Sequence, residues 1–483
     1  MFTFFGAIIL LIIAYFTYGK FVEKQFMPKN ERPTPAYANN DGVDYVPMNK
    51  QKNALIQLLN IAGTGPIFGP IMGALFGPVA FIWIVVGAIF AGAVHDYLTG
   101  MISIRNRGAH IPELAGRFLG KFSRHIVNFF ALLLLVLVGT VFITTPASLL
   151  SIVTNGAVAT GIFAALIILY YFLSTILPID KIIGRVYPFF GAILLFGTIG
   201  VGIALLFSGT PIPELTLENL HPDNLPIFPI LFFTITCGAL SGFHATQSPI
   251  ISRTVKKESE GRYIFYGMMI AEAIIAMIWA AAAMSLFHGD ALNALISEGT
   301  PSAVVSEVSI TLLGAVAGTI AVLGVIVLPI TSGDTAFRAA RSIIADYLNI
   351  SQKKASRRLM IAIPLFVIAY ILMQIDFNIL WRYFSWANQA TAVIALWIGT
   401  MYLFVKGRKY IISLIPALFM TYMVLVYILN AQIGLRLDLN VSFIVGAILT
   451  VAFTVWFFWT AHKNKKAGLE VDINVESIDT KVS

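Results

Sequence analysis

Two apolar stretches of this chain are interrupted by glycine, proline and polar residues. The interruptions span residues 60–70 and 237–249, and each lies inside a segment that is otherwise apolar enough to cross a membrane. In lipid, an unpaired backbone amide or carbonyl costs several kcal/mol, so a helix opens only where protein or water receives the exposed groups. Each interruption is therefore a candidate site for a small ligand or an ion. Two interrupted helices in matching places are typical of the binding site of a secondary transporter.

The first interruption favours binding through the backbone. Pro66 and Pro70 remove amide donors, whereas Gly63 and Gly65 tolerate unwinding, which loosens the nearby carbonyls. A loosened carbonyl can bind a cation or accept a hydrogen bond from a substrate. The predicted substrate contacts are Gly63, Thr64, Gly65 and Pro66, and the predicted ion ligand is Ala62.

The second interruption is richer in side-chain chemistry. Polar groups without hydrogen-bond partners cost free energy in a membrane, so a small polar or anionic ligand that binds them would be stabilised. The partial positive charge at the start of the half-helix that follows would also favour an anion. His244 could also carry a proton, since imidazole titrates at about pH 6.5. The alternative is a neutral histidine bonded to a neighbouring carbonyl. The polar side chains are Ser241, His244, Thr246, Gln247 and Ser248, and the predicted substrate contacts are Ser241, Gly242, His244, Gln247 and Ser248.

Three ionisable residues fall inside other apolar segments. Glu272 lies near the middle of its segment, where a bare carboxylate is costly, so it is protonated, paired or part of a relay. His95 and Asp96 lie late in theirs, and Asp96 could instead pair with the basic loop that follows. Together with His244, these residues form a predicted proton relay: His95, Asp96, His244 and Glu272.

Two further polar groups interrupt late apolar segments. Thr331, Ser332 and Asp334 combine hydroxyls with a carboxylate, and such hard oxygen ligands suit a small cation, although a polar helix end is the alternative. Asn388 and Gln389 are uncharged and would hydrogen-bond across helices. We predict that the first group binds an ion and that the second contributes to the substrate site.

The composition identifies a membrane protein. With 58% hydrophobic and 12% charged residues, the chain is far too apolar for a soluble globule. Its net charge of +8 comes from short basic blocks between apolar runs, where lipid headgroups explain them, so no nucleic-acid partner is expected. Cys237 is the only cysteine, which excludes an intrachain disulfide. The first apolar segment lacks a basic start and a cleavage site, so we interpret it as a retained helix.

Length and charge predict the spans and their orientation. A span needs about 20 apolar residues. All but two of the 32 Lys and Arg residues lie in or beside the connections after odd-numbered spans, and the exceptions are Arg382 and Arg436. This alternation predicts an external N-terminus and a cytoplasmic C-terminus in the inner (plasma) membrane. The thirteen predicted spans are 2–21, 54–78, 80–104, 125–152, 157–178, 187–208, 226–250, 263–287, 305–331, 359–375, 378–404, 410–430 and 441–461.

The two interrupted spans are the second and the seventh, and they run in opposite directions. Five spans therefore form one unit and the next five an inverted copy of it. We expect an all-α polytopic fold with a five-plus-five inverted repeat. The predicted divisions are 1–53 for the first helix and its loop, 54–208 and 226–404 for the repeats, 405–461 for two peripheral spans and 462–483 for a cytoplasmic tail.

Five motifs resemble those of the carbon starvation protein A (CstA) family. They lie at residues 40–47, 62–70, 241–247, 331–338 and 384–389, in the family's order over roughly 37–390, although many members are longer. The resemblance implies a secondary transporter of the amino acid–polyamine–organocation type that takes up pyruvate in some members and small peptides in others. It also implies that 63–70 and 241–248 are the unwound helices. Thr331 and Ser332 would lie on the helix that completes a sodium site in sodium-coupled relatives.

These observations predict a cation-coupled importer of a small carboxylate such as pyruvate, working by alternating access. The coupling ion is H+ or Na+, and the number of buried ionisable groups favours protons. No cofactor and no particular oligomeric state is predicted, and membrane lipid is the expected surrounding. The alternatives are a short-peptide transporter, a membrane-embedded enzyme and a starvation sensor. The enzyme is disfavoured because no nucleophile beside a base and no soluble domain is evident.

Overall fold

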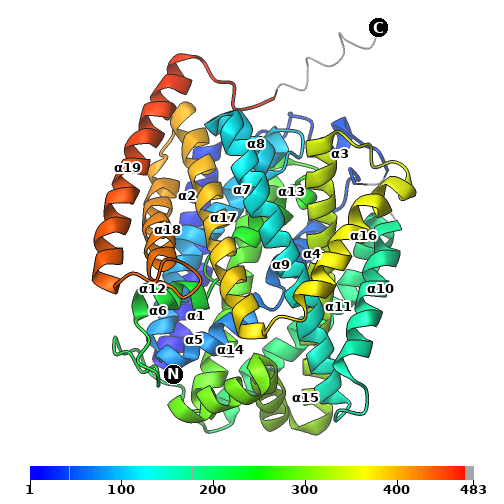
Figure 1. The fold of residues 1–483 in the computed structure, drawn as a ribbon, viewed down its shortest axis with the longest axis vertical. Helices are drawn as coiled ribbons and strands as arrows, with labels where there is room; N and C mark the ends of the chain where they lie inside the picture. The colour runs from blue at the N-terminus through cyan, green and yellow to red at the C-terminus, as the bar shows by residue number, and fades with distance from the viewer. Residues whose placement is uncertain (43, 177–178, 474–483) are drawn as a thin grey trace.

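The computed structural model describes residues 1–42, 44–176 and 179–473, and every regular element among them is a helix (Figure 1). The elements of the first half are α1 (Phe2–Phe16), α2 (Tyr18–Phe26), α3 (Pro35–Ala38), α4 (Lys50–Ala62), α5 (Gly65–Gly73), η1 (Ala74–Phe76), α6 (Val79–Gly87), η2 (Ala88–Gly92), α7 (Ala93–Arg105), α8 (Ile111–Leu119), α9 (Lys121–Val153), α10 (Thr160–Ile176) and α11 (Ile179–Phe207). Those of the second half are α12 (Ile227–Thr234), α13 (Gly242–Ser252), η3 (Glu258–Glu260), η4 (Arg262–Tyr266), α14 (Gly267–Leu286), α15 (Gly289–Leu348), α16 (Ala355–Leu372), α17 (Phe377–Val405), α18 (Ile411–Asn430) and α19 (Leu439–Lys466).

Both predicted helix interruptions are present. The first separates α4 from α5, whose axes differ by 45° in direction. The second is the non-helical segment 235–241 between α12 and α13. The two broken helices run antiparallel, because the amide of Met48 before α4 donates to the carbonyl of Thr254 after α13, and Gly73 at the end of α5 packs on Leu231 of α12. Inverted repeats require this arrangement.

The structure supports nine or ten of the thirteen predicted membrane spans. Among the described residues, nine helices are long and apolar enough to cross a membrane, or ten when α4 with α5 and η1 counts as one span. The other predicted spans fall on α10, α11 and the α12–α13 pair. α10 has 17 residues, and the apolar stretch of α11 that could be assessed is Gly191–Phe207, although α11 itself has 29 residues. α12 and α13 are separated by their interruption.

The ninth predicted span, 305–331, begins too early. The 60-residue α15 changes direction at Thr300 (φ 60°) and Gly314 (φ 77°), which leave the right-handed helical region. Figure 1 shows the parts before these turns lying across the lower end of the bundle. Hydropathy does not distinguish such a lateral segment from the start of a span, because both are apolar.

Alternate connections lie on opposite ends of the molecule. At one end, the Met1 ammonium group pairs with Glu214 in the connection between α11 and α12. At the other end, the loop after α2, the end of α7, the segment before η4 and the chain after α19 meet around three carboxylates. The pairs there are Arg32 with Glu258 and Asp472, Arg105 with Glu258 and Asp472, Lys406 with Asp472, and Arg338 with Asp44.

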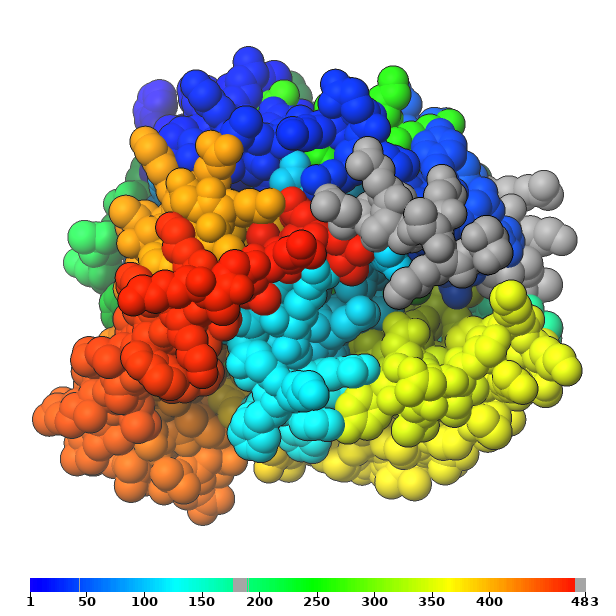
Figure 2. Space-filling view, turned by 90° about the horizontal axis from the view of Figure 1, so that it is seen from above, coloured from blue at the N-terminus to red at the C-terminus, as the bar shows by residue number. Residues whose placement is uncertain are grey.

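Figure 2 shows this second end, where the early loops (blue), α8 (cyan) and the chain after α19 (red) cover the surface. Asp472 anchors the red segment. Burial would raise the pKa of Asp472, but its hydrogen bonds with Lys406 and Tyr402 lower it overall. The alternation of connections matches the charge alternation in the sequence, and the basic end is the one that the positive-inside rule assigns to the cytoplasm.

Large apolar side chains cover the sides of the bundle. α19 is typical, because only five of its side chains are buried in the structure. Such a surface suits lipid and would be unstable in water. The exposed apolar residues of α19 include Val441, Ile444, Ile448, Val451, Val455 and Trp459.

One buried ion pair at the basic end is expected to stabilise the fold strongly. Arg105 donates to both carboxylate oxygens of Glu258 at 3.1 and 3.0 Å, and the Glu258 side chain is fully buried. Glu258→Gln removes the nearer of the two carboxylates that pair with the buried Arg105 guanidinium and leaves Asp472 at 3.8 Å, so the loss is expected to be about 3 kcal/mol. Thermal unfolding in detergent should show a clearly lowered Tm, whereas Glu214→Gln, at an exposed pair, should change the Tm little. Equal Tm values for the two variants would contradict the prediction.

Candidate functional site

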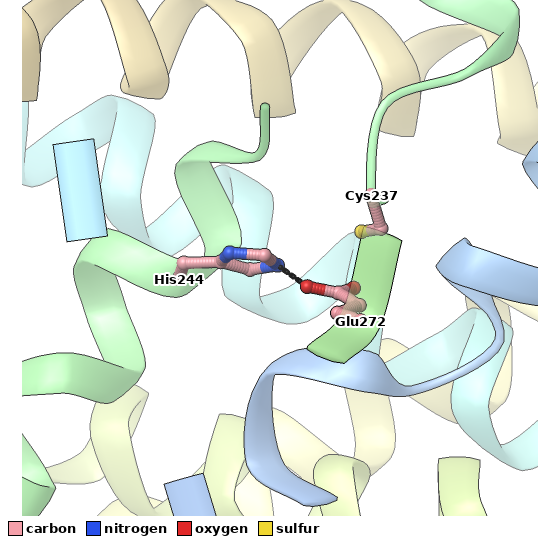
Figure 3. Close-up of side chains that lie close together, drawn as sticks. All are labelled: Cys237, His244 and Glu272. Carbon is pink, nitrogen blue, oxygen red and sulfur yellow. Dashed lines mark ion pairs between the residues drawn. The ribbon is translucent and has the colours of Figure 1, made fainter. Parts of the chain in front are cut away.

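A line of four ionisable side chains crosses the centre of the bundle. His95 Nδ1 lies 2.8 Å from Asp96 Oδ1, and the other Asp96 oxygen lies 2.9 Å from His244 Nδ1. His244 Nε2 in turn lies 3.4 Å from Glu272 Oε2. Figure 3 shows His244 and Glu272 pointing toward each other. The structure therefore brings together all four residues of the predicted relay, and each of them is buried.

Asp96 is engaged inside the protein and not with the basic loop. Sequence reasoning left pairing with that loop open, because Asp96 was placed near the cytoplasmic end of its span. In the structure its two oxygens face two histidines, one of them on α13, 148 positions away in the chain. The preceding π-helix η2 packs against the second interruption, where Gly92 approaches the Ala239 carbonyl. π-helical turns often mark functional sites because they change the register of the side chains that follow.

The imidazole of His244 is flanked by two acids. A protonated imidazole donates from both ring nitrogens, so Asp96 and Glu272 can both accept from it. A neutral imidazole has one donor only, and one of the two acids must then hold the proton for both contacts to persist. Burial raises the cost of every state with an unpaired charge. The arrangement thus suits the gain, transfer and loss of a proton.

Cys237 lies beside this line and was missed as a site residue. One ligand atom each from Cys237, His244 and Glu272 lie within 4.8 Å of one another (Figure 3), a set that could approach a metal ion. In the structure the thiol hydrogen-bonds to Ser241 Oγ at 3.2 Å, and the imidazole faces the two acids. The thiol thus has a hydrogen-bond partner, whereas His244 Nε2 and both Glu272 oxygens have none among the described residues. We interpret the three side chains as part of the polar cluster around the second interruption.

The two interruptions touch each other. Gly63 has a positive φ of 49°, a conformation that glycine adopts without strain, and it ends α4. Two residues later, the backbone of Gly65 lies so close to Cys237 that a Cβ at position 65 would overlap its side chain. Pro66 also lies near Gly238. The predicted contacts of the first interruption therefore lie against the second, as a shared binding site requires.

Asn388 on α17 supports the second interruption. Its Oδ1 accepts hydrogen bonds from the Phe243 amide at 2.7 Å and from Ser241 Oγ at 3.1 Å. Gly242 packs against the same turn of α17. Gln389 differs, because its Nε2 donates to the Phe232 carbonyl of α12 at 2.9 Å. Asn388 thus belongs to the central cluster, whereas Gln389 fastens α12 to α17.

Several buried polar atoms near both interruptions lack a hydrogen-bond partner among the described residues. They include both amide atoms of Asn60, Thr64 Oγ1, Gln247 Oε1 and Asn388 Nδ2. An unsatisfied buried polar atom costs about 1–3 kcal/mol, so a polar ligand or water that supplied the missing bonds would be stabilised here. Asn60 was not among the predicted contacts. Its spacing of three residues from Gln57 would have revealed it, because the two lie on one face of α4.

The remaining predicted residues separate into two places. Ser248 Oγ accepts a long hydrogen bond of 3.4 Å from Gln57 on α4, on the side of the interruptions nearer the basic end. Ser332 on α15 donates to the Leu59 carbonyl at 2.7 Å, three residues before Ala62. Thr331 donates to Leu328 of its own helix. Asp334 instead accepts from Ser174 on α10 at 2.7 Å. The hydrogen bonds of Ser332 and Asp334 therefore lead to different helices, α4 and α10.

The sequence of this chain matches a known protein family and several known proteins. A model of a protein family described as "Carbon starvation protein CstA" matches residues 1–165, 157–315 and 301–427. An uncharacterized membrane protein of Haemophilus influenzae is 48% identical over 352 residues, which cover 62% of this chain and 95% of that protein.

Two relatives of Escherichia coli K12 carry functional names. The chain is 26% identical to the peptide transporter CstA over 85% of its own length and 78% of that protein. It is 28% identical to the pyruvate/proton symporter BtsT over 59% of its own length and 49% of that protein. The solved structure of MhsT in complex with L-phenylalanine is similar in fold, with a TM-score of 0.56 and 13% identity over 86% of this chain and 99% of MhsT. The chain therefore has the fold of LeuT-type transporters.

Proposed function

This chain belongs to the carbon starvation protein CstA family of secondary transporters, and we propose that it imports a small carboxylate such as pyruvate together with protons. The family is one of transporters, which rejects the alternative of a membrane-embedded enzyme. The observation that carries the proposal is the buried imidazole of His244 between two acids, next to two interrupted helices. A name of one relative, the pyruvate/proton symporter BtsT, supports the same choice.

The substrate would bind between the two interruptions. A carboxylate suits the beginning of α13, because the amino-terminal end of a helix carries partial positive charge. Protonation of His244 would also offset the negative charge of Asp96 and Glu272, which would otherwise repel the carboxylate. Unpartnered amide atoms of Asn60 and Asn388 would supply hydrogen bonds to the rest of a small polar molecule. Binding of the anion and binding of the proton would then favour each other.

Alternating access would open this site to one face at a time. In the structure Gly63, Thr64, His244 and Glu272 are all enclosed, so substrate entry requires the helices around them to move. With the predicted external N-terminus, protons would enter down the membrane potential. Each elementary charge that crosses contributes about 2.3 kcal/mol per 100 mV, so at least one more proton than substrate charge must enter per cycle to use the potential.

A short-peptide substrate is the second candidate. It is favoured by the relative that shares the longest aligned region among those with functional names, the peptide transporter CstA of Escherichia coli K12. A dipeptide also carries a carboxylate, so the same end of α13 would serve it. The two candidates differ in the room that they need between the interruptions.

Uptake into liposomes containing the purified protein tests the proposal. Labelled pyruvate and a labelled dipeptide are each supplied under an inward pH gradient, an inward sodium gradient, or neither. We expect pyruvate to accumulate under the pH gradient and to leave again when a protonophore is added. Accumulation of pyruvate only under the sodium gradient would overturn the proposed coupling to protons. Accumulation of the dipeptide but not of pyruvate would overturn the proposed substrate. Protein-free liposomes are the control.

A further inference from the structure

A cavity with a largely apolar wall and a few polar side chains lies at the Met1 end of the two interruptions. It has a volume of about 370 Å³ and is formed by η1, α12, the first half of α17, the end of α18 and the connections 208–226 and 431–438. These connections are at the same end of the molecule as Met1 and Glu214. With the predicted orientation, the cavity opens toward the outside of the cell. We call it the outer cavity.

The outer cavity contains one positive charge and no balancing negative charge. Arg382 lines it, whereas no carboxylate is among its described lining residues. Arg382 donates to the neutral side-chain oxygen of Gln432 at 2.7 Å, and no described carboxylate lies within ion-pair distance of it. Because a guanidinium has five donors, one bond to an amide orients it and leaves donors for a further acceptor.

The charge of Arg382 is unusual for its surroundings. Arg382 and Arg436 are the only basic residues on this side of the predicted topology. The surrounding connections are otherwise acidic, which would repel a small anion everywhere except near these arginines. The acidic residues there are Glu214, Glu218, Asp223, Asp290, Glu298, Asp376 and Asp438.

The inner wall of the outer cavity adjoins the central site. Thr234, the last residue of α12 before the second interruption, lines the cavity. Ser385 also lines it, and its buried hydroxyl has no hydrogen-bond partner among the described residues. Ser385 lies one helical turn before Asn388, which supports the second interruption. A ligand held between Arg382 and Ser385 would therefore lie about one helical turn from Asn388 and the central cluster.

We propose that the outer cavity is a binding site for a small carboxylate, held by Arg382 and Ser385 before the molecule reaches the interrupted helices. The charge and the donors of the cavity support its preference for an anion. That this anion is the transported substrate rests on the proposed function. The outer cavity would favour anions over cations and neutral molecules at the entrance, whereas the central cluster would couple substrate binding to proton binding.

The test measures the electrostatic potential in the cavity directly. Asn378 lines the outer cavity one helical turn from Arg382, and its side chain is exposed. Cys237, the only native cysteine, is buried, so Asn378→Cys creates one reactive thiol. Its rates of reaction with anionic (sulfonatoethyl) and cationic (trimethylammonioethyl) methanethiosulfonates are compared in the full-length protein in liposomes. The unsubstituted protein supplies the background rate of Cys237.

Removal of the arginine charge should change the two rates in opposite directions. Adding Arg382→Gln is expected to lower the ratio of the anionic to the cationic rate by roughly tenfold, as expected for one unit charge a helical turn away. Arg382→Lys keeps the charge and should keep the ratio. Arg436→Gln is the matched control, because Arg436 contacts the same Gln432 but does not line the cavity. A ratio unchanged by Arg382→Gln, or lowered equally by Arg436→Gln, would overturn the proposal.

Protection by pyruvate connects the cavity to its ligand. Millimolar pyruvate should slow modification of Asn378→Cys in the protein with Arg382, and should lose this effect in Arg382→Gln. Absence of protection in the protein with Arg382 would overturn the carboxylate assignment. Protection together with absent pyruvate uptake would retain the outer site and reject the proposed function instead. Monodisperse elution of each variant in detergent shows that it is folded.

Discussion

Replacing His244 with alanine is expected to abolish exchange of labelled substrate across a liposome membrane. The imidazole lies within 2.9 Å of Asp96 and 3.4 Å of Glu272, and alanine would leave these two acids without the group between them. The variant would also lose the imidazole whose protonation offsets the charge of these two acids near a bound carboxylate. We expect counterflow of labelled pyruvate to fall at least about a hundredfold, which corresponds to roughly 2.7 kcal/mol.

His125→Ala is the matched control for this experiment. His125 is exposed and bonds Tyr347 between α9 and α15, far in the chain from both interruptions. Counterflow by the control should match that of the unsubstituted protein. Counterflow that survives in His244→Ala would remove this residue from the transport site. Thermal unfolding of both variants separates loss of function from loss of fold.

Glutamine at position 272 is expected to separate exchange from accumulation. Glu272 is fully buried, and glutamine keeps its size and hydrogen-bonding capacity but does not gain or lose a proton. If Glu272 carries the coupled proton, both faces can still exchange substrate, since exchange needs no net proton movement. Uptake driven by a pH gradient should then fall at least about a hundredfold while counterflow stays within about threefold of the unsubstituted protein.

The comparison of two assays on one variant makes this prediction specific. A general structural defect would lower counterflow and gradient-driven uptake together. Glu307→Gln replaces an exposed carboxylate on α15 and should alter neither assay. If Glu272→Gln still concentrates pyruvate under a pH gradient, Glu272 is not the proton carrier, and Asp96 with His244 would be the remaining candidates.

The two helix interruptions could be predicted because they depend on local chemistry. Gly63, Gly65 and Pro66 occur within four residues of an apolar segment, and no regular helix accommodates that combination at low cost. The family resemblance was likewise carried by short motifs, and the matching family model confirmed it. The thirteen predicted spans were supported only in part, because nine or ten of them lie on described helices that are long and apolar enough to cross a membrane. The start of the ninth span was placed too early, because the lateral part of α15 is as apolar as a crossing helix.

The contacts of the central site could not be predicted from the sequence, because they join residues that are far apart in the chain. Asp96 and His244 are 148 positions apart, and only the packing of α7 against α13 brings them together. For the same reason, the sequence predicted Thr331, Ser332 and Asp334 as one ion-binding group, although neighbours on one helix point in different directions. Arg382 was visible only as an exception to the charge alternation. Its meaning required the cavity that the structure shows around it.

The contact between Gly65 and Cys237 makes the single thiol of this chain a native conformational probe. Only 1% of Cys237 is exposed, and the backbone of the other interrupted helix lies against it. A small maleimide reaches the sulfur only during moments when these helices part. The rate at which Cys237 is alkylated therefore reports how often the helices separate, without an engineered label. A substrate that holds the helices together would lower this rate.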